Sequence, residues 1–265
     1  MIASIRRLGL TLLLLGACLT APCRGQDADI LTVAVDANAP PFMYEENERV
    51  GGLYPRLVSA VCDKAGIPHA FRALTWRRAI FELDRSAMAA AGIYKTVNRE
   101  QRYDFSLPLY QERIVVVYLR QRPIDFRSLT DLDNKRVGVM AGWSYGDEFD
   151  RARADKRFSA YDGDSDRQNL QLLQRGNLDA VLAIQEAMDA RMQNGAYANL
   201  AVAPAILASK ATYLAINKTS PQLPLLQRFN QALEKMRQDG SYQQLVKQFF
   251  SGRPPPNPRP DLAPP

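Results

Sequence analysis

The sequence predicts an α/β fold with two lobes, each built on a mostly parallel sheet flanked by helices. Short apolar segments alternate with amphipathic segments of helical period, an order typical of parallel strands joined by crossover helices. The series is interrupted after residue 119 and then starts again. The 265 residues, 46% of them hydrophobic, suffice for one large domain or two modest ones with a sizeable core.

The first series of elements spans residues 27–119 and forms the first lobe. A β-rich strand over 30–35 must end before Pro40 and Pro41, because proline lacks an amide donor and has a fixed φ. Residues 87–92 are small and nearly all apolar, which is typical of a buried parallel strand. The other elements predicted here are a helix over 55–65, a strand over 69–73, a helix over 77–84 and a strand over 114–119.

Residues 120–208 form the second lobe in this prediction. Gly176 and Asn177 mark the end of a helix directly before an apolar strand. The predicted elements are strands over 136–140 and 178–184 and helices over 147–154, 168–175 and 185–193.

The C-terminal residues are expected to return to the first lobe. A strand over 212–216 and helices over 223–238 and 242–250 have no α/β unit of their own, so residues 209–252 are assigned to that lobe. The chain then crosses between the lobes twice, which predicts a two-strand hinge. The Pro-rich residues 253–265 are expected to be unstructured.

The N-terminus has the features of a signal peptide. Arg6 and Arg7 precede an apolar run over 8–15, too short to span a bilayer, which takes about 20 residues. Two processing routes fit. Either a lipobox over 15–18 directs lipid to Cys18 and residues 1–17 are removed, or a signal peptidase cuts after Gly25 and removes 1–25. Both routes predict a periplasmic protein, and only the first gives it a contact with the membrane, through the lipid on Cys18.

The charge of the mature chain argues against a nucleic-acid partner. The formal net charge is +6 for the full chain, but three arginines lie in the leader, and the rest carries 31 basic and 28 acidic residues. No run of five basic residues occurs. The charge therefore favours a small-molecule ligand over nucleic acid. We also expect a monomer.

One cysteine and one histidine limit the chemistry of the mature chain. Cys62 is the only cysteine after residue 25, so it has no internal disulfide partner, and its helical spacing predicts a buried core thiol. His69 is the only histidine and sits beside Pro68 in an expected turn. A histidine-dependent nucleophile or a histidine-ligated metal is poorly supported. We expect no catalytic residue, no metal and no cofactor.

Several short motifs follow one another along residues 31–252. They are Asp36-Ala-Asn-Ala-Pro-Pro-Phe42, Gly51-Gly-Leu-Tyr-Pro-Arg-Leu57, Thr96-Val-Asn-Arg99, Tyr103-Asp-Phe-Ser-Leu-Pro-Leu-Tyr110, Asp131-Leu-Asp-Asn-Lys-Arg-Val-Gly-Val139, Gly176-Asn-Leu-Asp-Ala180 and Asp239-Gly-Ser-Tyr242. In this order the sequence resembles the bacterial extracellular solute-binding proteins of family 3, the polar amino-acid binders of ABC transporters. The resemblance implies a two-lobed periplasmic binding protein type II fold and a transporter permease as partner.

Arg99 is the first candidate for a ligand contact. Its guanidinium offers a planar fork that matches a carboxylate, and it follows the buried 87–92 strand near the carboxyl edge of the sheet. In the family, the matching arginine grips the ligand α-carboxylate. On the same loop, Gly92 would let a ligand approach the backbone, while Tyr94 and Thr96 could donate hydrogen bonds. A helix N-cap is the equally weighted alternative for Thr96.

Four more residues complete the predicted site. Trp76 matches a family aromatic that packs over the ligand, with core packing as the alternative. Gly142 and Ser144 match a turn before a helix, whose amides attract anions. Asp36 is retained from the opening motif. Ile184 stands where the family places its ammonium-binding aspartate, so the carboxylate half of the site is present and the ammonium half is open.

Three classes of function compete. The first is a binding protein that closes on a carboxylate-bearing solute for an ABC transporter. The second is a sensory module for a membrane signalling partner, suggested by Tyr54-Pro55 in place of the family's acids. The third is a dehydratase-type enzyme, which needs a carboxylate of raised pKa in the cleft, and Glu186 is the candidate. The ordered motifs favour the first class, a protein that is not an enzyme.

Overall fold

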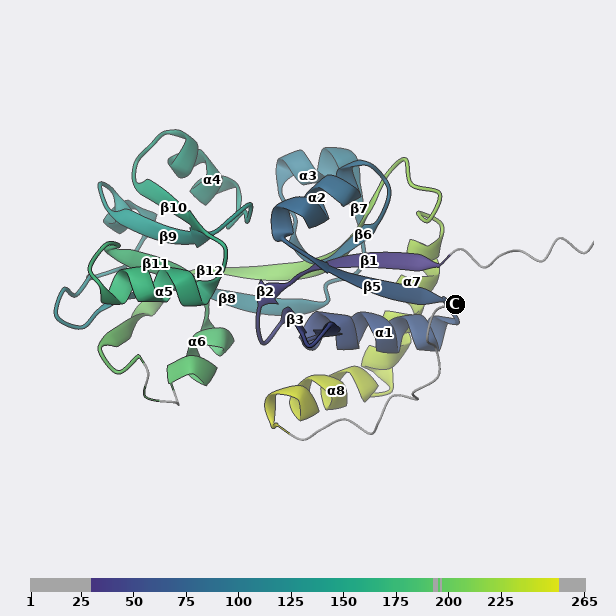
Figure 1. The fold of residues 1–265 in the computed structure, drawn as a ribbon. Coiled ribbons are helices and arrows are strands. Elements are labelled where there is room, and N and C mark those ends of the chain that lie inside the picture. The colour runs from purple at the N-terminus through teal and green to yellow at the C-terminus, as the bar shows by residue number, and fades with distance from the viewer. Residues whose placement is uncertain (1–29, 193–194, 196, 253–265) are drawn as a thin grey trace, which may run out of the picture.

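The computed structural model describes residues 30–192, 195 and 197–252, which form two α/β lobes joined by two long strands (Figure 1). The two-lobed α/β fold is therefore confirmed. The predicted leader over 1–25, the lipidation site Cys18 and the tail over 253–265 lie outside these residues. Within the described ranges, no helix combines the length and the apolar character that a bilayer span requires.

The first lobe is built on three parallel strands and two covering helices. β1 (Leu31–Asp36) lies between β5 (His69–Leu74) and β6 (Ala89–Tyr94). All of β6 is buried, as its small apolar side chains predicted. Helices α1 (Leu53–Ala65) and α2 (Trp76–Asp84) lie on opposite faces of this sheet (Figure 1).

Several short elements of the first lobe were not predicted. β2 (Asn38–Ala39), β3 (Met43–Glu46) and β4 (Arg49–Gly51) form a separate small antiparallel sheet. Helix α3 (Val97–Arg102) and strand β7 (Tyr103–Phe105) follow β6. Elements this short carry too little hydrophobic periodicity to be recognised in a sequence.

The second lobe has its own parallel strands in the order β10-β9-β11. These are β10 (Ser159–Gly163), β9 (Arg136–Met140) and β11 (Ala180–Ile184), and the helices are α4 (Asp147–Ala154), α5 (Asp166–Gln174) and α6 (Gln185–Met192), preceded by a 3-10 turn over Leu129–Leu132. Strand β10 was missed because it lies at the sheet edge, where exposed and half-buried side chains alternate.

Two antiparallel strands connect the lobes. β8 (Tyr110–Leu119) pairs with β12 (Leu200–Asn217) from Leu119 opposite Leu200 to Tyr110 opposite Thr212. At their far ends β8 pairs with β11 of the second lobe, and β12 pairs with β6 of the first. A single continuous sheet therefore runs through both lobes.

The hinge strands are longer than the sequence predicted. Residues 114–117 of β8 already pair with β11, so the chain enters the second lobe before the predicted boundary at 119/120. The predicted strand over 212–216 is only the end of β12, whose first part is largely half-buried and contains Pro204. A strand that runs through two lobes packs against different neighbours along its length. Its hydrophobic residues therefore show no regular period from which the full length of the strand could be predicted.

The last two helices pack on the first lobe. Helix α7 (Leu225–Gln238) lies against α1, and α8 (Ser241–Phe250) lies against both α7 and α1. The buried residues of α7 follow the predicted helical period and are Leu226, Phe229, Ala232, Leu233 and Met236.

Candidate ligand site between the lobes

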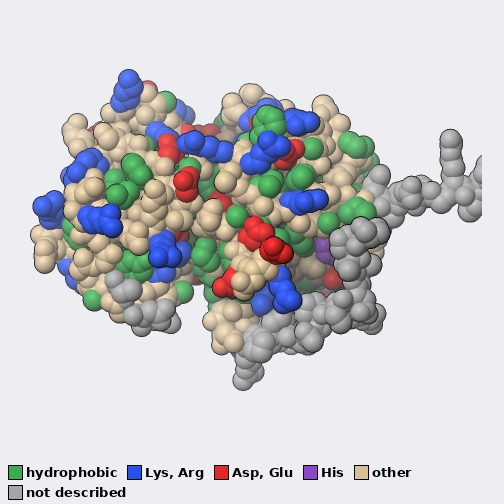
Figure 2. All heavy atoms as spheres, in the orientation of Figure 1, with side chains coloured by type: hydrophobic (Ala, Val, Ile, Leu, Met, Phe, Trp, Pro, Cys, Tyr) green, Lys and Arg blue, Asp and Glu red, His purple; other side chains and the backbone are tan. Residues whose placement is uncertain are grey.

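The carboxyl ends of four parallel strands meet between the lobes. β1 ends at Asp36 and β6 at Tyr94 in the first lobe, while β9 ends at Met140 and β11 at Ile184 in the second. Open α/β sheets hold their ligands at this edge. In the space-filling view a notch separates the lobes, with acidic and basic side chains along it (Figure 2).

Trp143 is the residue that joins the two halves of this region. Its indole Nε1 donates a hydrogen bond of 3.0 Å to Asp36 Oδ2 in the other lobe. Its ring centroid lies 6.1 Å from that of Trp76 and 6.4 Å from that of Tyr94. Three predicted site residues, Asp36, Trp76 and Tyr94, therefore surround one side chain of the protein itself.

Asp36 is held by two donors at the end of β1. Besides the Trp143 indole, its carboxylate accepts a 2.9 Å hydrogen bond from the backbone amide of Asn38. Burial raises the pKa of Asp36, and these two hydrogen bonds oppose the rise. The sequence predicted Asp36 as a ligand contact, and the structure places it at the end of β1 between the lobes. Trp143 was seen only as part of a turn.

Glu112 is a buried carboxylate that the sequence analysis missed. It lies on β8, and the hydroxyls of Tyr54 and Tyr94 donate to its two oxygens. Burial raises the pKa of Glu112 to about 8, against the effect of the two tyrosine hydrogen bonds. The predicted strand began at residue 114, so this acid was left outside it. The available signal in the sequence was a single acidic residue, Glu112, two positions before the apolar run over 114–117.

Gly92 makes room for a side chain of the protein. Its φ is 77°, a left-handed conformation that favours glycine. A Cβ at this position would lie 2.7 Å from Tyr54 Cδ2 and 3.0 Å from Met43 Cε. The sequence analysis expected a ligand to approach the backbone at Gly92, whereas in this structure the Tyr54 ring lies there.

Thr96 and Arg99 lie on the first turn of α3. Thr96 Oγ1 accepts a 3.2 Å hydrogen bond from the backbone amide of Arg99, so Thr96 caps the helix. The Arg99 side chain is 8% exposed and donates from Nη1 to the Tyr94 carbonyl at 3.0 Å. Burial lowers the pKa of Arg99, while nearby Tyr103 and Asp150 oppose the fall.

The turn before α4 is occupied by the protein's own carboxylates. The Ser144 hydroxyl donates to Asp150, and it accepts from the amide of Gly146 at 3.1 Å. The first turn of α4 carries Asp147, Glu148 and Asp150. The negative charges of these acids already interact with the positive end of the helix dipole, so an incoming anion would have to displace them.

Gly142 lies where the lobes touch. Its φ is 78°, and a Cβ there would meet Arg77 Cγ at 2.7 Å. On the same side, the Val97 amide donates to Asp147 Oδ1 at 3.2 Å. Gly142 therefore belongs to the closing surface between the lobes.

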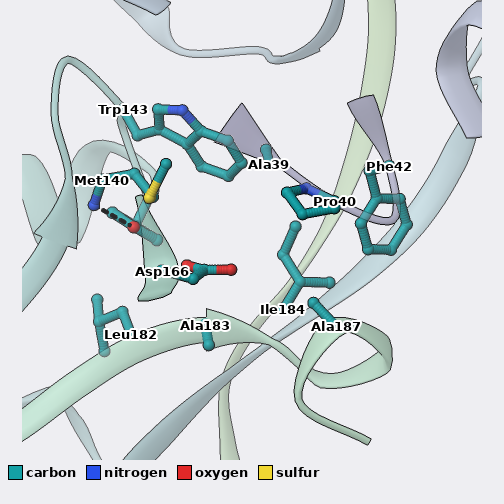
Figure 3. A pocket seen from close by; sticks show the side chains of 11 residues that line it. Ala39, Pro40, Phe42, Met140, Trp143, Asp166, Leu182, Ala183, Ile184 and Ala187 are labelled. Atoms are coloured by element: carbon teal, nitrogen blue, oxygen red, sulfur yellow. Dashed lines mark hydrogen bonds between the residues drawn. The ribbon is translucent and has the colours of Figure 1, made fainter. Parts of the chain in front are cut away.

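Met140 lines two cavities between the lobes in this closed arrangement. One measures about 10 Å³ and is lined from both lobes, with Ile184 and Asp166 among its walls (Figure 3). The other measures about 110 Å³ and is lined by Asp36, Asn38, Thr75, Trp76, Arg77, Met140, Ala141 and Asp164. The smaller has the volume of roughly one water molecule. Separation of the lobes is therefore needed to admit a solute to the smaller cavity.

Cys62 is buried, as its helical spacing predicted, and burial raises the pKa of its thiol to about 12. His69 is bonded to Ser59 Oγ at 2.9 Å, away from the cleft. In the part of the chain that the structure describes, no group of three or more His, Cys, Asp or Glu side chains is arranged around a metal position.

The family model of the bacterial extracellular solute-binding proteins, family 3, matches residues 31–252. The chain belongs to this family. It is a solute-binding protein with the periplasmic binding protein type II fold, as the ordered motifs predicted, and family members are binding proteins rather than enzymes.

Relatives of known role are similar along most of the chain. The arginine-binding extracellular protein ArtP of Bacillus subtilis is 24% identical over 253 residues, which cover 91% of this chain and 97% of ArtP. The L-cystine-binding protein TcyJ of Escherichia coli is 23% identical over 224 residues, which cover 83% of this chain and 82% of TcyJ. An ancestral arginine-binding protein solved with arginine is 26% identical with a TM-score of 0.72, covering 83% and 98%.

A sensor domain is also similar in fold. A histidine kinase sensor domain with similarity to periplasmic binding proteins superposes with a TM-score of 0.75 at 19% identity, covering 83% of this chain and 96% of that domain. At this identity the likeness concerns the fold alone.

Proposed function

We propose that this protein captures a small polar solute bearing a carboxylate in the cleft between its lobes and delivers it to an ABC transporter. The observation that carries the proposal is that Arg99 is buried without an ion-pair partner. Arg99 is 8% exposed, its guanidinium donates to the Tyr94 carbonyl, and among the described residues no carboxylate lies within 4.0 Å of it. A buried cation without an ion-pair partner is costly, and a bidentate ligand carboxylate would offset that cost.

The contacts across the cleft suit a cycle of opening and closing. The polar contacts include Trp143 to Asp36 at 3.0 Å, Val97 to Asp147 at 3.2 Å, and Arg191 Nη2 to the Pro40 carbonyl at 3.2 Å. These polar groups can bond to water when the lobes part, which lowers the cost of breaking them. The two hinge strands would absorb the rotation.

The relatives support an amino acid as the solute. ArtP is named for arginine, TcyJ for cystine, and the ancestral protein was solved with arginine. Both ligands, arginine and cystine, carry an α-carboxylate, which the Arg99 guanidinium would bind. The full set proposed for ligand contact is Asp36, Trp76, Gly92, Tyr94, Thr96, Arg99, Gly142 and Ser144, although Gly92, Thr96 and Ser144 already serve internal partners.

A sensory module is the second candidate function, and the fold of the histidine kinase sensor domain favours it. Tyr54, which replaces one of the family's acids in the α1 start, is hydrogen-bonded to Glu112 on hinge strand β8. That link would couple the first lobe to the hinge. A dehydratase reaction has less support, because the Glu186 carboxylate faces Arg113 at 3.7 Å and accepts from Tyr110 at 3.3 Å.

Export to the periplasm and a monomeric state complete the proposal. The mass of the mature N-terminus distinguishes the two processing routes: a chain beginning at Gln26 has been cut by signal peptidase, whereas a chain beginning at an acylated Cys18 is a lipoprotein. Size-exclusion chromatography with light scattering measures the oligomeric state, and we expect the mass of one chain.

A thermal-shift screen tests solute capture. The wild-type protein is heated with the standard L-amino acids, L-cystine, succinate, glutarate and putrescine, each in large excess. A carboxylate-bearing solute at 100 times its Kd should add about 2.7 kcal/mol to the free energy of unfolding. Putrescine, which lacks a carboxylate, should leave the melting temperature unchanged. A shift with putrescine and none with any carboxylate would contradict the proposed grip.

A further inference from the structure

The Trp143 side chain reaches from the second lobe into the first. It starts on the loop between β9 and α4, and its ring extends toward Ala39 of the first lobe (Figure 3). Trp143 is 9% exposed, and its indole Nε1 donates to Asp36 Oδ2 at 3.0 Å. A carboxylate that faces the cleft is therefore already bonded to a donor of the protein itself.

The indole stands where the proposed ligand contacts converge. Its ring centroid lies 6.1 Å from that of Trp76, with the planes tilted by 56°, and 6.4 Å from that of Tyr94, with the planes nearly perpendicular at 88°. Asp36, Trp76 and Tyr94 all belong to the first lobe and are all proposed to contact the solute. Because packed side chains leave little free volume between them, a solute held by these three residues needs the space that the indole fills.

The two cavities that Met140 lines do not offer that solute another place. Their volumes are about 10 Å³ and about 110 Å³, and the larger is lined by both Asp36 and Trp76. Neither Tyr94 nor Arg99 is among the residues that line them. Arg99 donates to the Tyr94 carbonyl at 3.0 Å, so the proposed carboxylate grip lies on the Tyr94 side of the indole. A solute that reaches both Arg99 and Asp36 therefore has to take the volume of the indole.

We propose that Trp143 is an internal competitor of the solute: its indole occupies the ligand position in the closed conformation, and the solute must displace it to bind. This inference rests on the proposed function and adds a step to it. Trp143 belongs to the second lobe and Asp36 to the first, so parting of the lobes breaks their hydrogen bond and clears the position. The apparent affinity for the solute is then reduced by the fraction of molecules whose cleft the indole occupies.

The first test compares affinities after the internal hydrogen bond is removed. Isothermal titration calorimetry is run with L-arginine, L-glutamate and succinate on wild type and on Trp143→Phe. A phenylalanine cannot donate to Asp36, so the solute that binds should bind the variant about 10-fold or more tightly. An equal or lower affinity in Trp143→Phe overturns the proposal.

A control variant separates competition from general loosening of the fold. Leu173 is fully buried in a separate core cluster of the second lobe, so Leu173→Ala loses packing without touching the cleft. This variant should bind the solute like wild type. If Leu173→Ala gains affinity as much as Trp143→Phe, the gain comes from loosening and the proposal is overturned.

The second test follows the indole itself. The chain has two tryptophans, so Trp76→Phe leaves Trp143 as the only one. If Trp76→Phe does not bind, the signal is read instead as the difference between wild type and Trp143→Phe. Solute that displaces the indole moves it into water, so its fluorescence should shift to longer wavelength and acrylamide should quench it more strongly. An unchanged signal, or a shift to shorter wavelength, means that the indole stays in place and overturns the proposal.

The outcomes distinguish this inference from the proposed function. If a solute binds wild type and loses binding in Arg99→Ala, while the indole stays buried and Trp143→Phe gains no affinity, the proposed function stands and this inference fails. If none of the three solutes binds either wild type or Trp143→Phe, both fail.

Discussion

Trp143 donates a 3.0 Å hydrogen bond to Asp36 across 107 positions of sequence and from one lobe to the other. The same indole lies between Trp76 and Tyr94, so it fills the part of the cleft where the sequence placed the ligand. In the closed conformation the protein therefore binds its own side chain. A solute that takes the place of the Trp143 indole on Asp36 must separate the lobes first.

Trp143→Phe should lower the free energy of unfolding. The substitution keeps an aromatic ring but removes the donor, which leaves the buried Asp36 carboxylate with the Asn38 amide alone. We expect a loss of about 1–3 kcal/mol in urea unfolding. Tyr161→Phe, at a 40% exposed aromatic of the same lobe, is the control and should change stability little. Equal stability of Trp143→Phe and wild type would show that the hydrogen bond does not hold the lobes together.

Glu112 should make stability depend on pH. The pKa of this carboxyl is about 8 in the folded protein and 4.5 in an exposed glutamate, so the folded state binds the extra proton between these values. The contribution of Glu112 to stability is then fully present below about pH 4.5 and declines as the pH rises toward 8. Glu112→Gln should flatten the decline by about one proton. Urea unfolding at about pH 5 and about pH 8 measures it, and an equally steep decline in the variant would contradict the assignment.

Gly92→Ala should destabilise the first lobe whether or not a ligand is present. The added Cβ would press on Tyr54 and adopt a left-handed φ. We expect a loss of about 1–3 kcal/mol in the free energy of unfolding, measured by urea titration. Gly240→Ala is a useful control, because it has a similar φ of 79° and nothing within 4 Å of its Cβ. If the two variants lose the same stability, packing against Tyr54 is not the reason for glycine at 92.

The sequence predicted regular elements better than the cleft. Strands such as β6 and β9 and the period of α7 were recognised because continuous apolar character and helical spacing are local signals. Arg99 and Asp36 were identified from short motifs. The contacts of Trp143 and the burial of Asp166 depend on how two lobes meet, which no local pattern contains. The hinge strands were cut short for the same reason.

Calorimetric titration of Arg99→Ala tests the central claim most directly. The solute is the carboxylate-bearing compound with the largest shift in the wild-type screen, and Arg102→Ala, an exposed arginine of the same helix paired with Asp84, is the control. We predict that Arg99→Ala weakens binding by about 100-fold or more, as expected when one partner of a buried charge pair is removed, while Arg102→Ala binds like wild type. Unchanged affinity in Arg99→Ala would contradict the carboxylate grip.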